Sequence, residues 1–186
     1  DWTERHYDFA GYVTGFDPGE FANRERLRAE LGHRPAEQVC IVTVGGSGVG
    51  RALLERVIAA FPHARRLVPD LRMIVVAGPR IDPASLPAHD GLEVRAFVPD
   101  LYRHLAACDL AVVQGGLTTA MELTANRRPF LYFPLRHHFE QNFHVRHRLE
   151  RYGAGRRMDF ETDGPAEIAA AIAEEIGRDV DYRPVE

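Results

Sequence analysis

Short apolar runs alternate with amphipathic stretches along this chain, and this alternation restricts the fold more than any other feature. Residues 39–44 form a β-branched run that stops at two glycines, and the stretch 51–61 behind it has its apolar residues at helical spacing. Strands that are apolar throughout and separated by helices are typical of a parallel sheet covered on both faces. With right-handed crossovers, the sequence predicts an α/β fold with a Rossmann-like, doubly wound parallel sheet.

Hydrophobic periodicity and turn residues assign the other elements in the same way. Ligands of such sheets bind beyond the carboxyl ends of the strands, so the loops that follow strands are the expected site. The expected strands are 39–44, 73–77, 92–98, 110–113 and 130–133, the expected helices are 51–61, 101–107, 119–125, 139–152 and 165–176, and the loops of interest are 45–50, 78–80, 97–100, 114–119 and 134–142.

A length of 186 residues suits one α/β domain. Residues 1–22, which are rich in glycine and contain Pro18, are predicted to be an interdomain linker-like segment. Residues 23–186 would then form the domain itself. Because no stretch before residue 39 suits a second full domain, we expect either an excised domain, which we favour, or one subunit of a split protein.

Charge and composition exclude some classes of partner. The formal net charge of −4 gives no general attraction to nucleic acid or to an anionic membrane. No apolar stretch is long enough to span a bilayer, and the polar start lacks the apolar region of a signal peptide. Cys40 and Cys108 lie in or beside apolar strands, so we expect buried, unpaired thiols and a cytoplasmic location.

The first glycine-rich loop, Gly45-Gly46-Ser47-Gly48-Val49-Gly50, stands between a strand and a helix. Glycines allow a ligand to approach the backbone, and the free N–H groups of a helix start favour an anion. The loop is not a P-loop, because Arg51 and Ala52 follow Gly50, and Arg51 also replaces the third glycine of a dinucleotide motif. A tight strand-to-helix turn without a ligand is the alternative.

The second glycine-rich loop is Gln114-Gly115-Gly116-Leu117-Thr118-Thr119, followed by Glu122. Two such helix starts at one sheet edge would suit a diphosphate. Glu122 has two interpretations. It could complete a capping box with Thr119, or its carboxylate could accept hydrogen bonds from ribose hydroxyls.

A third loop carries three adjacent polar side chains, Glu140, Gln141 and Asn142, where a strand has ended at Phe133-Pro134 and a helix begins. They could bind sugar hydroxyls, or they could form an ordinary polar first turn in which Glu140 complements the helix dipole.

These three loops, in this order, resemble the C-terminal, donor-binding domain of GT-B glycosyltransferases. The similarity runs from about residue 11 to residue 176 and is strongest to the branch with the peptidoglycan N-acetylglucosaminyltransferase and the UDP-glycosyltransferases. It rests on Gly-Gly-Ser-x-Gly after the first strand, on Gly-Gly-x-x-Thr-x-x-Glu after a later strand, and on the proline-to-glutamine motif from Pro134 to Gln141. The resemblance implies sugar transfer from a nucleotide diphosphate sugar, most often a UDP-sugar, to an acceptor hydroxyl.

The resemblance also implies roles for particular residues. The first loop would face the donor phosphates, the second would bind the diphosphate, and Glu122 would hold the ribose. An aromatic-aliphatic pair would flank the uracil, and the acid–glutamine pair would contact the sugar. Gln114 departs from the family, in which many members carry histidine at that position. The implied donor-binding residues are Gly46, Ser47, Gly48, Phe97, Val98, Gln114, Gly115, Gly116, Leu117, Thr118, Thr119, Glu122, Glu140, Gln141 and Asn142.

Two helix N-termini can stabilise a leaving diphosphate without a metal, so no metal or other cofactor is expected. In related inverting enzymes the catalytic base belongs to the N-terminal acceptor domain, so that domain or a partner subunit would supply it and this chain alone would be inactive. The resemblance also leaves open a peripheral membrane association of the full enzyme.

The sequence also allows three other interpretations. A nucleotide-sugar epimerase or hydrolase of the same fold would carry its acid and base in this chain, and a non-catalytic module would only bind a nucleotide or a protein. The histidines 137, 138, 144 and 147 could indicate a metal site, but solvated side chains explain them better.

Overall fold

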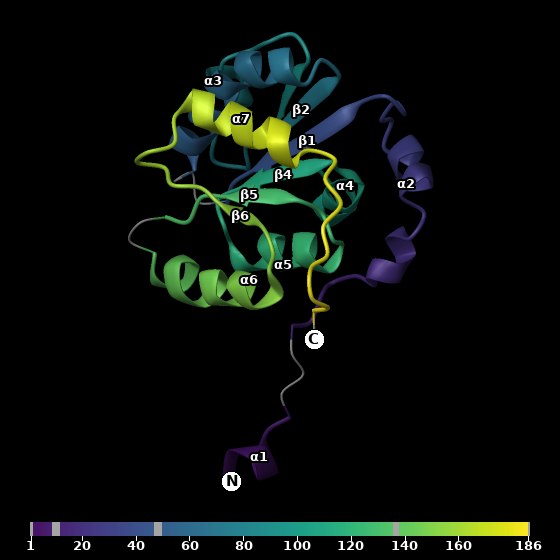
Figure 1. Ribbon diagram of the computed structural model, residues 1–186, viewed down its shortest axis with the longest axis vertical. Coiled ribbons are helices and arrows are strands. Elements are labelled where there is room, and N and C mark those ends of the chain that lie inside the picture. Colours follow the sequence, from purple (N-terminus) through teal and green to yellow (C-terminus); the bar gives the residue numbers. More distant parts are fainter. Residues whose placement is uncertain (1, 9–11, 47–49, 136–137, 186) are drawn as a thin grey trace.

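A computed structural model describes residues 2–8, 12–46, 50–135 and 138–185. Its centre is a six-stranded sheet in the order β3-β2-β1-β4-β5-β6, in which every pairing is parallel (Figure 1). This is the strand order of a doubly wound Rossmann-like sheet, so the predicted fold class is confirmed. The strands are β1 (Gln38–Thr43), β2 (Leu71–Val76), β3 (Leu92–Arg95), β4 (Leu110–Val113), β5 (Phe130–Tyr132) and β6 (Arg156–Arg157).

Helices cover both faces of the sheet. In Figure 1, α3 (Arg51–Leu67) and α7 (Pro165–Glu175) lie on one side, and α5 (Leu117–Ala125) and α6 (Arg146–Tyr152) lie on the other. The remaining helical segments are α1 (Trp2–His6), η1 (Pro18–Phe21), α2 (Arg24–Glu30), η2 (Pro83–Ser85), α4 (Leu101–Ala107) and η3 (Glu140–Val145).

The alternation of side chains along β1 divides the core into two. Cys40 and Val42 belong to the apolar cluster that includes α3 and α7. Val39 and Ile41 belong to the cluster that includes residues of α5 and α6. Because successive residues of a strand face opposite sides of a sheet, a strand that is apolar throughout must be covered on both faces.

Several predicted elements are confirmed. α4 and β4 begin and end at the predicted residues, and η3 with α6 forms the expected helix up to Tyr152. Both cysteines are buried and unpaired, as expected. The third strand was predicted too long, since β3 ends at Arg95. The helix after β1 was predicted too short, since α3 ends at Leu67. The sequence prediction missed the two-residue strand β6, the helices α1 and α2 and the short helical turns η1 and η2.

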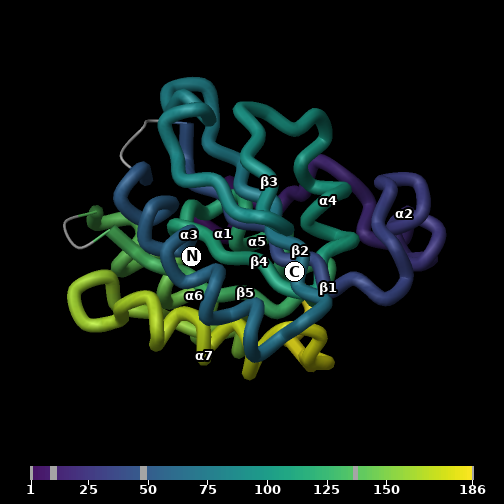
Figure 2. The backbone as a smooth tube through the Cα atoms, turned by 90° about the horizontal axis from the view of Figure 1, so that it is seen from above, coloured from purple at the N-terminus to yellow at the C-terminus, as the bar shows by residue number. Residues whose placement is uncertain are grey.

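The helix α2 is attached to the amino ends of the strands by an ion-pair network. The carboxylate of Asp109 accepts hydrogen bonds from the guanidinium of Arg24, from Arg28 Nη1 at 2.8 Å and from the backbone N–H of Val39 at 2.7 Å. Arg28 is buried and also donates to the carbonyl of Glu37 at 2.6 Å. Figure 2 shows α2 at one end of the molecule, away from α3 and α6. The helix α2 therefore does not cover the carboxyl ends of the strands.

Candidate functional site

The loops after β1 and β4 meet at the carboxyl edge of the sheet. β1 and β4 are paired with each other. The other neighbour of β1 in the sheet is β2, and the other neighbour of β4 is β5, so the strand order reverses between β1 and β4. A Cβ atom built on Gly45 would lie 3.8 Å from Gln114 Oε1, so the two loops are adjacent. Ligands of doubly wound sheets bind at such a switch point. Ser47 and Gly48, which were predicted to face the phosphates, lie outside the described residues.

The glycines of these loops are of two kinds. A Cβ on Gly50 would lie 2.3 Å from Val44 Cβ, and Gly115 has a φ of +89°, so the fold itself requires both glycines. Among the described residues, a Cβ on Gly46 would have only Pro79 near it, at 3.9 Å, and a Cβ on Gly116 would have no atom within 4 Å. Because Gly116 has a φ of −66°, the backbone does not require glycine there either. The packing of the described residues therefore does not account for glycine at these two positions.

The amino end of α5 offers unpaired backbone donors. The helix begins at Leu117 with Gly116 as its N-cap, and no side chain caps it. The first backbone N–H that bonds within the helix is that of Ala120, which donates to the Gly116 carbonyl at 3.1 Å. Among the described residues, the amides of Leu117, Thr118 and Thr119 have no acceptor. Such an end attracts an anion.

The start of α5 at Leu117 shows that Thr119 and Glu122 do not form a capping box. A capping box requires Thr119 as the N-cap and Glu122 as the third helical residue. In the structure the helix has already begun at Leu117, so Thr119 is itself the third helical residue and Glu122 lies one turn further on. The carboxylate of Glu122 therefore stabilises no helix start, and the structural explanation for this residue fails.

Glu122 is half-buried and has no hydrogen-bond donor or cation partner for its carboxylate within the described ranges. Burial alone raises the pKa of this carboxyl above its ordinary value. Thr118 lies one turn before it on the same helix face, and the hydroxyl of Tyr12 lies close enough to the Thr118 side chain for that side chain to lower the tyrosine's pKa. Tyr12 also lies close enough for the charge of Glu122 to raise the tyrosine's pKa, although burial raises it more. Tyr12 was not among the predicted site residues, because no local pattern in the sequence indicates that this segment packs against α5.

Phe97 and Val98 follow β3 at the same edge of the sheet. Val98 is 4% exposed and packs in the core cluster of α5 and α6, whereas Phe97 is 73% exposed. A large apolar ring that is held in solvent beside a buried neighbour can stack on a flat ligand.

The polar side chains of the third loop differ in whether they are bonded within the loop or exposed to solvent, where a ligand could reach them. Gln141 is buried, and its Oε1 accepts a hydrogen bond from Leu135 N at 2.8 Å. Asn142 Nδ2 donates to the carbonyls of Leu135 and His138 at 2.5 and 3.0 Å. These two side chains thus shape the loop from within. Glu140 is exposed at the first residue of η3 and remains available to a ligand.

A cavity of about 860 Å³, here called the edge cavity, opens beside these loops. Gln114 and Asn142 line it, so it joins the second and third loops. Its opposite wall consists of Arg157, Asp159 and Glu161, from β6 and the loop behind it. Sequence reasoning missed this wall, because two exposed arginines give no hydrophobic strand signal.

Histidines and carboxylates do not gather into a metal site in the described part of the chain, where no group of three or more potential ligands is found. His137 lies outside that part. Within it, no helix is long and apolar enough to cross a membrane.

Chemically, the assembled edge offers an anion site at the start of α5, an unpaired carboxylate one turn away, an exposed aromatic ring and a polar cavity. Amide N–H groups and a helix dipole stabilise a diphosphate. A carboxylate accepts hydrogen bonds from paired hydroxyls. The edge can therefore offer hydrogen-bond donors to an anion, a carboxylate to hydroxyl groups and an aromatic ring to a flat ligand.

Comparisons with known proteins show the family and the fold of the chain. An uncharacterized glycosyltransferase of Methanosarcina acetivorans is 32% identical over 142 residues, which are 76% of this chain and 35% of that protein. The UDP-N-acetylglucosamine--N-acetylmuramyl-(pentapeptide) pyrophosphoryl-undecaprenol N-acetylglucosamine transferase of Anaeromyxobacter sp. is 31% identical over 112 residues, 58% of this chain and 28% of that enzyme. The chain thus spans about a third of the length of these relatives.

Among solved structures, the calicheamicin glycosyltransferase CalG4 matches with a TM-score of 0.63 at 22% identity, over 77% of this chain and 36% of that one. The spinosyn rhamnosyltransferase SpnG complexed with thymidine diphosphate matches with a TM-score of 0.53 at 24% identity, over the same shares of the two chains. Both share the fold. The family model of the glycosyltransferase family 28 C-terminal domain matches residues 39–177. The chain therefore belongs to the glycosyltransferase family 28 C-terminal domain family.

Proposed function

We propose that this chain is the donor-binding part of a glycosyltransferase that transfers a sugar from a nucleoside diphosphate sugar, with UDP as the nucleotide, to an acceptor hydroxyl. The observation that carries the proposal is the open amino end of α5 beside the unpaired carboxylate of Glu122. The UDP-sugar transferase named among the relatives and the thymidine diphosphate in the SpnG complex support a nucleoside diphosphate.

In this proposal the diphosphate lies on the amides of Leu117, Thr118 and Thr119, with Gly46, Ser47, Gly48, Gly115 and Gly116 leaving room for it. As the sugar–phosphate bond breaks, negative charge builds on the leaving diphosphate. Fixed amide dipoles stabilise that charge without having to reorient. Glu122 holds the ribose, and Phe97 and Val98 flank the base.

The sugar lies toward the edge cavity, where Gln114, Glu140, Gln141 and Asn142 surround it. Gln141 uses its oxygen on the Leu135 amide, so its Nε2 group is the part available to a sugar hydroxyl. Arg157, Asp159 and Glu161 extend the wall of this subsite.

The rest of the enzyme completes the reaction. Residues 1–22 are the linker-like segment and 23–186 the donor-binding domain in this proposal. An N-terminal acceptor domain or a partner subunit supplies the base that deprotonates the acceptor hydroxyl. The proposal places the enzyme in the cytoplasm and leaves room for a peripheral membrane association of the whole protein.

Calorimetric titration of the chain with UDP, TDP and GDP tests the proposal. We expect UDP to bind at one site and more tightly than UMP, because UDP adds the second phosphate at the start of α5. Thr118→Val should weaken UDP binding, while Thr162→Val, a change of an exposed threonine beyond β6, should not. If none of the three diphosphates binds, the donor-site assignment is wrong.

A further inference from the structure

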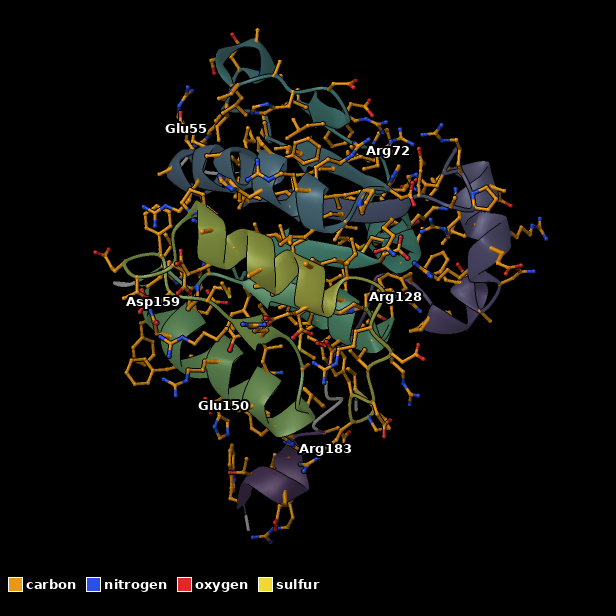
Figure 3. All side chains as sticks on the ribbon, turned by 45° about the horizontal axis from the view of Figure 1, so that its top comes forward. Glu55, Arg72, Arg128, Glu150, Asp159 and Arg183 are labelled. Carbon is orange, nitrogen blue, oxygen red and sulfur yellow. The ribbon has the colours of Figure 1, made fainter. Side chains whose placement is uncertain are left out.

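A second charged crevice lies at the amino edge of the sheet, away from the proposed donor site. Its volume is about 260 Å³. Figure 3 shows Arg128 in this region, toward α2, and Asp159 of the edge cavity at the other end of the sheet. The crevice, here called the arginine crevice, is formed by the start of α2, the turn after α5 and the segment after α7. Its charged lining residues are Arg24, Asp109, Arg127, Arg128, Arg178 and Asp179.

Positive charge exceeds negative charge in the arginine crevice. Four arginines and two aspartates line it, which leaves an excess of two positive charges, 4 − 2. Asp109 is already engaged by Arg24 and by Arg28, which lies behind the crevice. Arg178 pairs with Glu175, which is not part of the lining, at 3.1 Å. Adding Arg28 and Glu175 to the count leaves the excess unchanged.

Arg127 and Arg128 contribute the unpaired cations. Among the described residues, neither has a carboxylate within ion-pair distance. Arg128 is half-buried, and its Nε donates to the backbone carbonyl of Asn126 at 3.0 Å, which positions the guanidinium and leaves its two Nη groups without an acceptor in the described chain. In addition, the Nε of Arg24 is buried without a hydrogen-bond partner. Three guanidinium groups therefore have unused donors at one place.

Burial makes this arrangement costly without an anion. Desolvation lowers the pKa of Arg128 most and the neighbouring charge of Arg24 lowers it further, whereas the charges of Asp109 and Asp179 raise it. The two carboxylates offset burial and repulsion only in part, because the net pKa of Arg128 is lowered and Asp109 is already held by Arg24 and Arg28. An oxyanion would supply negative charge to Arg24 and Arg128 and accept hydrogen bonds from them, because guanidinium groups donate paired, parallel hydrogen bonds to phosphate oxygens.

We propose that the arginine crevice binds a phosphate group through Arg24, Arg127, Arg128 and Arg178. Its volume suits a phosphate or a diphosphate rather than a whole nucleotide, so any larger part of the ligand extends into solvent. The group comes either from a soluble phosphate ester or diphosphate or from a phospholipid headgroup. The recognition chemistry is the same for both sources, and the two arms of the test separate them.

The first arm is a titration of the ¹⁵N-labelled chain with inorganic pyrophosphate, followed by amide chemical shifts. We expect saturable shifts at Arg127, Arg128 and residues 177–179. Shifts at residues 115–119 would report the proposed donor site, so the two sites are distinguished by location. Arg127→Gln/Arg128→Gln should weaken the crevice titration by about tenfold or more, because charge-assisted hydrogen bonds are lost. Arg66→Gln, a change of an exposed arginine outside the crevice, is the charge-matched control for the single variants Arg127→Gln and Arg178→Gln.

The second arm is sedimentation with vesicles of phosphatidylglycerol in phosphatidylcholine. Binding to vesicles that is lost in the double variant, without a pyrophosphate effect at the crevice, supports the headgroup as the source. Pyrophosphate shifts without vesicle binding support a soluble phosphate.

The double variant changes Arg128, which is half-buried, and could therefore affect folding. Arg127→Gln and Arg178→Gln are tested singly as well, because both of these side chains are exposed. If neither ligand binds, or if binding survives all three substitutions, the proposal is overturned.

Discussion

Glu122→Ala should weaken UDP binding strongly and leave the stability of the chain nearly unchanged. The carboxylate would accept two hydrogen bonds from ribose hydroxyls, and a hydrogen bond to a charged group contributes about 1.5–3 kcal/mol. Because Glu122 is only half-buried, we reduce the sum for solvent screening to about 2–3 kcal/mol, which is about 30- to 150-fold in affinity.

The small change expected in the free energy of unfolding follows from the position of Glu122 in α5. The side chain caps nothing, has no partner in the described chain, and its desolvated carboxyl has a raised pKa. Alanine is also the better helix former by a few tenths of a kcal/mol. We therefore expect a change in unfolding free energy within about 0.5 kcal/mol, which corresponds to a melting-temperature shift of at most about 2 °C.

Glu167→Ala is the matched control. Glu167 is a glutamate that does stabilise a helix start, since its carboxylate accepts a hydrogen bond from Gly164 N at 3.0 Å before α7. Its loss should cost about 1 kcal/mol and lower the melting temperature by about 2–4 °C, with UDP affinity unchanged. Calorimetric titration measures the UDP affinity of both variants, and thermal unfolding measures their melting temperatures. If Glu122→Ala behaves like Glu167→Ala, the ribose assignment is refuted.

Three further predictions concern other parts of the molecule. Asp109→Ala removes the common partner of two arginines and should lower the unfolding free energy by about 3 kcal/mol in urea titrations; an unchanged midpoint would contradict the network's role. Burial lowers the pKa of His33 to about 4, so stability should fall as the pH drops from 6.5 toward 4, by up to about 3 kcal/mol, because the unfolded chain takes up the proton first. His33→Leu should flatten that dependence in denaturation curves at pH 7 and 5, and an equally steep dependence would exclude His33 as its source. The methyl group of Gly116→Ala meets no atom of the described chain within 4 Å, so the change should cost only about 0.5 kcal/mol in stability, yet weaken UDP binding at least tenfold; full affinity would show that the ligand does not approach this backbone.

Local sequence patterns predicted most of the sheet correctly. The run at β1 and the helix–strand pair of α4 and β4 have hydrophobic periods that do not depend on distant residues, so their positions could be read from the chain. The glycine pairs after β1 and β4 were likewise recognisable, because turns at strand ends leave a local signature.

The errors have physical causes. β6 is held by backbone pairing with β5, in the register Leu131 to Arg156, and its exposed side chains carry no apolar signal. The helix α2 is fixed by Arg24 and Arg28 on Asp109, a partner far away in the sequence. At α5, Thr119 has the chemistry of an N-cap, but Leu117 packs against the core and the helix begins there instead.

The sequence by itself determined the fold class and the loops in which a ligand site had to be sought, because periodicity and glycine turns are local properties. The tertiary structure decided what those loops can do. The pairing of β1 with β4 brings the two glycine turns together. The helix α5 begins at Leu117, so Glu122 does not cap it. Tyr12 lies beside Thr118 because its segment packs against α5. Such contacts depend on chain segments that are remote in sequence, and no local pattern encodes them.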